Sequence, residues 1–300
     1  MEDWEPNPKE TIWFDAYAGE RVRAAISWNS HMDQNDPWQA DELKSDLNLT
    51  VRDASSNVVD YSCSWDNSYE IVDFIVPTSG WYYFEISASR MDVSFEFVGF
   101  AYLRVPTFVT AFESTASDGS LAYGGFGIPY STIHDAPEAL YVFGSEDRLW
   151  IGQIAFWGTV CLYRTGLFFD TTSLPDGAVP VQGTLSLFGR YDDSATDFAI
   201  HVVRGAPLDD PLVAADYGDL LYEVETRGWL NTAYWVVGAY NDISLLGRGV
   251  AEISTIGLTK FGLRSHRDID YISPSGMECV IADSYEGSGR PRLTVRYMYG

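Results

Sequence analysis

The densest set of potential metal ligands lies between residues 31 and 46, in the stretch HMDQNDPWQADELKSD. Calcium binds six to eight hard oxygen ligands, and an acidic loop at the edge of a β-sandwich can supply them. The stretch is not an EF-hand, because it lacks the glycine and the terminal glutamate of that pattern. We therefore predict a structural Ca²⁺ site here, the alternative being a solvated acidic loop. The candidate ligands are Asp33, Asn35, Asp36, Asp41, Glu42 and Asp46.

Aromatic side chains form the second candidate site, because flat rings stack on sugar faces and lose little rotamer entropy. Tyr, Phe and Trp make up 15% of the chain. The alternative is that these rings pack in the core, and the stretch GWLNTAYWVVGAY (228–240) is apolar enough to form a protein interface instead. The predicted ligand-binding residues are Trp65, Trp81, Trp229, Tyr234 and Trp235, with Trp150 and Trp157 as further candidates.

Residues for catalysis are scarce. None of the four histidines lies in a Ser or Cys nucleophile motif, and no G-x-S-x-G occurs. His134, Asp135 and Glu138 lack zinc spacing on a helix, because Pro137 interrupts it. Paired carboxylates for glycoside hydrolysis come from separate strands and leave no spacing signature, so an unrecognised carbohydrate-active enzyme stays open as a further reading. We expect a protein that is not an enzyme.

The three cysteines, Cys63, Cys161 and Cys279, have no metal-binding spacing. Cys161 and Cys279 lie in apolar runs and are expected to be buried thiols, with a disulfide between them as the alternative.

The net charge of the chain excludes some classes of binding partner. The chain has 43 acidic and 19 basic residues and a net charge of -24. Such a field repels phosphate backbones and anionic lipid heads, so we expect no nucleic-acid partner and no membrane-surface partner. No run of about 18 or more uncharged apolar residues occurs, so we expect no membrane insertion. The first residues, MEDWEPNPKE, are not a secretory signal. Either the protein is made without one, as a virion protein is, or Met1 begins an internal fragment.

Alternation with period two runs through most of the chain and predicts β-strands. The pattern resets near Val105 and Pro106. We predict an all-β protein of two tandem jelly-roll β-sandwich domains, residues 1–105 and 106–300, with short helices at 210–221 and 249–257. The expected inward-facing residues include Val22, Ala24, Ile26, Trp28, Leu47, Leu49, Val51, Val72, Phe74, Val76, Tyr82, Phe84, Ile86, Ala88, Val181, Leu185, Leu187, Phe198, Ile200, Val202, Leu293, Val295, Tyr297 and Tyr299.

The segment YRTGLFFDTTSLPDGAVPVQGTLSLF (163–188) is an apolar run, a polar turn and a second apolar run. Leu167 and Phe169 fall on one face, so Phe168 points the other way and needs a second cover. In the turn, hydroxyls can bond nearby backbone groups, Gly177 can take a positive φ, and Leu174 tucks under the sheet. Arg164 is expected to be held by a carboxylate at a sheet end, in a structural role.

Two family resemblances follow from longer stretches. Residues 8–104, with SDLNL, the pair Asp66-Asn67 and PTSGWYY, resemble the jelly-roll (pre-peptidase-like) domain that follows the catalytic domain of secreted subtilisin-like proteases. Residues 118–299, with YRTGLFFDTTSLPDGA, GLTKFGLRSHRDID and SGRPRLTVRYMY, resemble the DNRLRE-type β-sandwich family, which is related to carbohydrate-binding modules. The second resemblance implies a module without enzymatic activity that serves in display, adhesion or glycan binding.

The expected function is therefore non-catalytic binding or display outside a cell, on a cell surface or on a virion surface. The expected partner is a glycan or a protein surface, including self-assembly. One alternative is a structural subunit of a virion or an extracellular filament. Another is the accessory region of a secreted subtilisin-like protease, whose catalytic motifs are absent from this chain.

Overall fold

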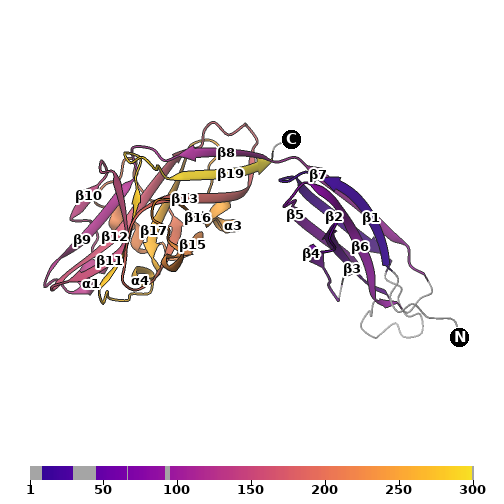
Figure 1. Ribbon diagram of the computed structural model, residues 1–300, viewed down its shortest axis with the longest axis horizontal. Helices are drawn as coiled ribbons and strands as arrows, with labels where there is room; N and C mark the ends of the chain where they lie inside the picture. The colour runs from indigo at the N-terminus through magenta and orange to yellow at the C-terminus, as the bar shows by residue number, and fades with distance from the viewer. Residues whose placement is uncertain (1–8, 30–44, 66, 92–94, 299–300) are drawn as a thin grey trace. The chain divides into compact units, whose positions relative to one another are not determined.

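The computed structural model describes residues 9–29, 45–65, 67–91 and 95–298. It is an all-β protein with a few short helices, which confirms the predicted fold class (Figure 1). The chain divides into two compact units, Met1–Phe108 and Val109–Gly300, called unit 1 and unit 2 below. No helix in the described ranges is both long enough and apolar enough to cross a bilayer.

Unit 1 is a sandwich of two antiparallel sheets with the strand orders β1-β6-β3-β4 and β5-β2-β7. Neighbours within a sheet are seldom neighbours in sequence, as in jelly-roll-like folds. Its strands are β1 (Lys9–Ala16), β2 (Arg21–Trp28), β3 (Ser45–Asp53), β4 (Val58–Ser62), β5 (Tyr69–Ile75), β6 (Gly80–Met91) and β7 (Val98–Val105).

The core of unit 1 lies between these sheets, where the inward faces of β2, β3 and β6 meet. The predicted faces are confirmed, with Phe74 and Ile86 packed at the margin of the core. The Trp28 indole also donates a hydrogen bond to the Ser45 carbonyl at 2.9 Å, so its polar atom is satisfied inside the core. The buried members are Phe14, Ala16, Val22, Ala24, Ile26, Trp28, Leu47, Leu49, Val51, Val72, Val76, Tyr82, Phe84 and Ala88.

Unit 2 is a curled sheet in which the long strand β13 (Val179–Ser194) belongs to two layers. Its first half pairs with β16 and β19, and its second half pairs with β18. The other strands are β8 (Phe108–Glu113), β9 (Gly119–Phe126), β10 (Tyr141–Phe143), β11 (Arg148–Phe156), β12 (Thr159–Asp170), β14 (Ala199–Arg204), β15 (Gly228–Asn231), β16 (Tyr240–Ser244), β17 (Leu258–Ser265), β18 (Met277–Asp283) and β19 (Arg292–Met298). Short helices connect them: α1 (Tyr130–His134), α2 (Asp216–Leu221), η1 (Thr232–Tyr234), α3 (Gly247–Ala251) and α4 (His266–Ile269).

The main core of unit 2 lies between the two layers. The predicted inward residues Leu185, Leu187, Phe198, Ile200, Val202, Leu293, Val295 and Tyr297 are all buried there. Val181 is only half-buried, because the pairing of β13 with β19 shifts between Pro180 and Gln182 and leaves it in a bulge. Tyr299 lies outside the described residues.

A second apolar cluster covers the outer face of β12. Leu167 and Phe169 lie in the main core, whereas Phe168 packs in the second cluster with Ile133 of α1 and Leu220 of α2. The prediction that Phe168 is covered by a second apolar layer is therefore confirmed. The following turn is also as predicted, with Gly177 at φ +78 and Leu174 buried.

The two predicted helices are placed inexactly by the sequence. The helix expected over 210–221 begins only at Asp216. The Asp216 carboxylate accepts backbone N–H groups from Asp209 and Val213, so the preceding residues form a turn around this side chain. The helix expected over 249–257 spans Gly247–Ala251, two residues earlier and much shorter.

Candidate functional site

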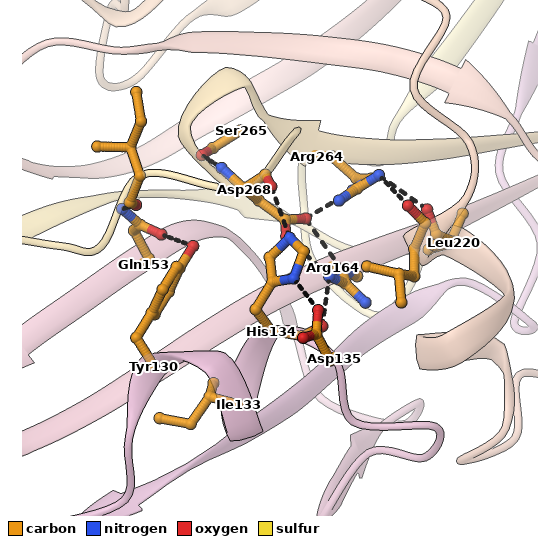
Figure 2. A network of polar contacts seen from close by, with 12 residues as sticks. Tyr130, Ile133, His134, Asp135, Gln153, Arg164, Leu220, Arg264, Ser265 and Asp268 are labelled. Carbon is orange, nitrogen blue, oxygen red and sulfur yellow. Dashed lines mark hydrogen bonds and ion pairs between the residues drawn. The ribbon is translucent and has the colours of Figure 1, made fainter. Parts of the chain in front are cut away.

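Arg164 of β12 is the centre of a buried polar network (Figure 2). Its guanidinium donates from Nε and Nη2 to the two carboxylate oxygens of Asp268, at 2.9 and 2.7 Å. The same group donates to the carbonyl oxygens of Tyr217 and His134, and it lies 4.2 Å from the centre of the Tyr217 ring. Every nitrogen of this side chain thus has a partner, as a buried charge requires.

Asp268 is fixed in α4, where the hydroxyl of Ser265 caps the helix by accepting the Asp268 N–H. Arg264 donates a second charged hydrogen bond to Asp268, at 2.6 Å, and reaches carbonyl oxygens at the end of α2 with its Nη1. Burial alone would raise the pKa of Asp268, but the guanidinium groups of Arg164 and Arg264 outweigh it and hold the pKa well below the usual range. The carboxylate is therefore ionised at any working pH.

His134 closes the network from α1. Its Nδ1 contacts the Asp135 carboxylate, and its Nε2 lies 2.9 Å from the Asp268 carbonyl oxygen (Figure 2). The rings of His134 and Tyr271 also pack in a T-shaped arrangement, with their centres 4.5 Å apart. Histidine, carboxylate and arginine converge here as they do in some active sites, yet Arg164, Arg264 and Asp268 are 0, 1 and 0% exposed. This network can hold α1, α2 and α4 against β12, but a substrate cannot touch its charged centre.

The predicted calcium ligands are mostly beyond what the structure describes. Asp33, Asn35, Asp36, Asp41 and Glu42 lie outside the described residues. Asp46 lies in β3 and is buried; its Oδ1 makes no hydrogen bond to another described residue, and burial raises its pKa. Among the described residues no group of three or more His, Cys, Asp or Glu side chains could hold a metal ion. The Ca²⁺ site thus stays a prediction from the sequence.

The predicted aromatic ligand-binding residues divide between the two units. Trp65 and Trp81 are exposed in unit 1, and Trp229 of β15 and Tyr234 of η1 are exposed in unit 2. Trp235 was wrongly assigned to this surface. It is 7% exposed and packs in the main core, because the turn of η1 directs it inward while Tyr234 faces solvent. The further candidate Trp150 is half-buried and stacks on Tyr163.

A polar surface hollow of about 400 Å³ lies in unit 2 near the end of η1. Its charged lining is Asp147, Arg190, Asp283 and Glu286, and Val237 and Gly238 contribute the wall that follows Tyr234 in sequence. Arg190 Nη1 donates to Asp147 at 2.6 Å, while Asp283 is held by the N–H of Gly289 at 2.8 Å. The hollow therefore presents fixed hydrogen-bond groups of both signs to solvent.

A further exposed feature is a set of three aromatic rings, Phe126, Phe156 and Trp157, which we call the apolar tip. Their exposed fractions are 80, 60 and 86%. Phe126 ends β9, and Phe156 ends β11 just before the turn into β12. Trp157 is among the further candidates from the sequence, whereas neither phenylalanine was predicted. The available signal was the glycine that follows each aromatic group, Gly127 after Phe126 and Gly158 after Phe156-Trp157, because glycine often marks a turn.

The cysteines are all free thiols, so the alternative of a Cys161–Cys279 disulfide is not realised. Cys279 is buried as expected and Cys161 is half-buried, and burial raises the pKa of both thiols.

The comparisons with known proteins show no family for this chain. No family model matches the chain, and no curated protein is similar to it. Among solved structures, the VP2 subviral particle of infectious bursal disease virus aligns with 98% of this chain and 76% of its own, at 11% identity and a TM-score of 0.18. Structures of the Gt and Gx strains of that virus align over the same shares at 9 and 10% identity, also with a TM-score of 0.18. Similarity at this level supports no argument about fold or function.

Proposed function

We propose that the protein is a non-catalytic binding protein that works outside a cell or on a particle surface, with a glycan as its preferred partner. The observation that carries this is the exposure of Trp65, Trp81, Trp229 and Tyr234, which range from 56 to 74% exposed. In the described part of the chain none of the four stacks on another ring. Exposed rings of this kind are characteristic of recognition surfaces, where they are buried by the partner.

The buried network supports the non-catalytic part of the proposal. The charged groups that converge on Asp268 are satisfied by one another and by backbone carbonyl oxygens. Catalytic groups must reach the reacting atoms, at about 2.6–3.2 Å. A closed network of this kind stabilises the fold instead.

The polar hollow favours a glycan over a flat protein surface. Its volume of about 400 Å³ falls within the range of small-ligand sites, about 300–1,000 Å³. Sugar hydroxyls both donate and accept hydrogen bonds, so the carboxylate of Glu286 and the guanidinium of Arg190 can each bond one. Tyr234 precedes the hollow-lining residues Val237 and Gly238 by a few positions and is suited to stacking beside them.

A glycan array tests the proposal. We expect the wild-type chain to bind a subset of glycans and the double variant Trp229→Ala/Tyr234→Ala to lose about tenfold or more in affinity, since each stacked ring contributes roughly 1 kcal/mol or more. The matched control is Tyr222→Ala, which removes a ring that is 81% exposed at the end of α2 and should bind as the wild type does.

Two results would contradict this function. One is an equal loss in the Tyr222→Ala control, which would show that aromatic stickiness alone produced the signal. The other is an array without hits together with concentration-dependent assembly of the wild type in light scattering, which would favour the alternative of a virion or filament subunit.

A further inference from the structure

The apolar tip is built from the adjacent strands β9, β11 and β12. Phe126 of β9 and Phe156 of β11 both lie opposite Thr159 of β12. The side chains of Phe126, Thr159 and Phe156 therefore form one row across the sheet. Trp157 stacks on Phe156 with ring centres 5.4 Å apart. Gly158 lies directly against the ring of Phe126: a Cβ at Gly158 would be 2.8 Å from a carbon of that ring. Two of the rings thus stack on each other, Phe126 lies against the turn beside them, and all three are open to solvent.

The turn at the tip uses an unfavourable residue. Phe156 pairs with Thr159, which leaves Trp157 and Gly158 as a two-residue loop, with φ +50 and +80. Two-residue hairpin loops with positive φ at both positions strongly prefer Asn-Gly, and a bulky residue in that conformation is an outlier. The tryptophan therefore costs local stability, and its exposure of 86% shows that packing within the described chain does not compensate. Strain retained at an exposed position points to a functional contact.

The tip is also free of charge. Residues 119–133, 149–163 and 271–277 contain no Asp, Glu, Lys, Arg or His, although 21% of the chain is charged and its net charge is -24. The first range contains β9, the second contains the turn end of the β11–β12 hairpin, and the third touches that end through the hydrogen bond from Ala155 N–H to the Gly276 carbonyl. The tip lies at the Thr159 end of β12, whereas Ser114, which follows β8, bridges to Phe169 near the other end of that strand.

These properties discriminate between possible partners. At roughly 200 Å² for each ring, the exposed area sums to roughly 450 Å², short of the about 800 Å² per partner of a stable dimer. A glycan site needs several polar groups beside the aromatic platform, whereas the row of the tip offers the hydroxyl of Thr159 and the charge-free segments offer no ionised side chain. An anionic membrane is repelled by the net charge. The uncharged interface of a zwitterionic bilayer accepts exposed Trp and Phe rings without such requirements.

We propose that the apolar tip of Phe126, Phe156 and Trp157 inserts into the interfacial zone of a zwitterionic lipid bilayer. This inference goes beyond the glycan binding proposed above and uses a different part of unit 2. It also revises two expectations: that of no membrane-surface partner, which followed from a net charge that the tip does not share, and that of no membrane insertion, which followed from the lack of a long apolar run.

Flotation with vesicles of pure phosphatidylcholine tests the proposal. We expect the wild-type chain to float with the vesicles and Trp157→Asn to reduce the bound fraction about tenfold or more. This substitution places Asn-Gly in the turn, so the variant should melt at a higher temperature than the wild type. Reduced binding by a more stable protein cannot arise from misfolding. The matched control, Trp229→Ala/Tyr234→Ala, removes two exposed rings elsewhere in unit 2 and should float as the wild type does.

Three results with pure phosphatidylcholine vesicles would overturn the tip as a lipid anchor. They are a wild type that stays with the unbound fraction, a Trp157→Asn variant that floats as well as the wild type, and a control that loses binding to the same extent. Stronger binding when phosphatidylserine replaces part of the phosphatidylcholine would also overturn it, because the proposal requires an uncharged surface. In the glycan array, Trp229→Ala/Tyr234→Ala is the test variant, whereas in flotation it is the control. Either proposal can therefore fail without the other.

Discussion

At the scale of single residues, Arg164 and Arg264 share the carboxylate of Asp268 and leave an excess of positive charge in the interior. Carbonyl oxygens compensate for it: those of His134 and Tyr217 for Arg164, and those of Leu220, Leu221 and Glu223 for Arg264. Two of these carbonyls belong to the last turn of α2, whose partial negative charge favours a cation. The cluster is tolerated because backbone dipoles replace the water that it lost.

Asp268→Asn should therefore be strongly destabilising. The amide keeps the shape of the side chain but leaves two buried guanidinium groups without a counter-charge, a change that costs about 3–5 kcal/mol in comparable buried pairs. Urea unfolding monitored by circular dichroism measures the free energy of unfolding. Glu113→Gln is the matched control, because Glu113 also pairs with two arginines, Arg290 and Arg292, at the surface. We expect the control to cost less than about 1 kcal/mol; equal losses in both variants would refute the special role of burial.

At the scale of elements, β11 lies between β12 and β18, and a glycine allows this close pairing. Gly152 stands opposite Tyr163 on one side and Cys279 on the other, with φ +119. A Cβ at this position would lie 2.2 Å from the carbonyl oxygen of Glu278. The backbone of β18 would have to move to admit any other residue, and Glu278 and Gln153 beside the buried network would move with it.

Gly152→Ala should consequently cost about 2–4 kcal/mol, the sum of backbone strain at a positive φ and of overpacking. Differential scanning fluorimetry gives the change in melting temperature. Gly276→Ala serves as the control, since a Cβ there meets nothing within 4 Å. A Gly152→Ala protein that melts with the control would show that β18 relaxes at little cost.

At the scale of the whole molecule, the acidic balance and buried carboxylates decide how stability depends on pH. Burial raises the pKa of Asp118 to about 7, although Ser114 and the Tyr285 N–H bond its carboxylate, and nearby Glu286 raises it further. The folded state therefore binds a proton more tightly than the unfolded state between about pH 4 and pH 7. Stability from this group falls as pH rises through that window. Mutual repulsion in a chain of net charge -24 acts in the same direction.

We expect the melting temperature to rise as the pH is lowered from 8 to about 5. Asp268 acts in the opposite sense, because its lowered pKa stabilises the fold only above the ordinary carboxylate range, so acid must eventually destabilise the protein. Asp118→Asn should flatten the slope between pH 5 and 8 and raise the melting temperature at pH 8. Asp176→Asn, at an exposed turn position, should keep the wild-type profile. If Asp118→Asn leaves the dependence of melting temperature on pH unchanged, Asp118 does not contribute to it.

The sequence by itself determined which way most strand residues face, because side chains alternate strictly along a strand and apolar ones must be buried. It thereby determined the all-β class, the second cover over Phe168 and the need of Arg164 for a carboxylate. Only the tertiary structure decided that Asp268, 104 residues away, supplies this carboxylate. It also decided that Trp235 is buried beside exposed Tyr234, and that Phe126 joins Phe156 and Trp157 in one tip. Such contacts depend on how segments far apart in the chain are placed side by side, including the register between their strands, which local periodicity does not encode.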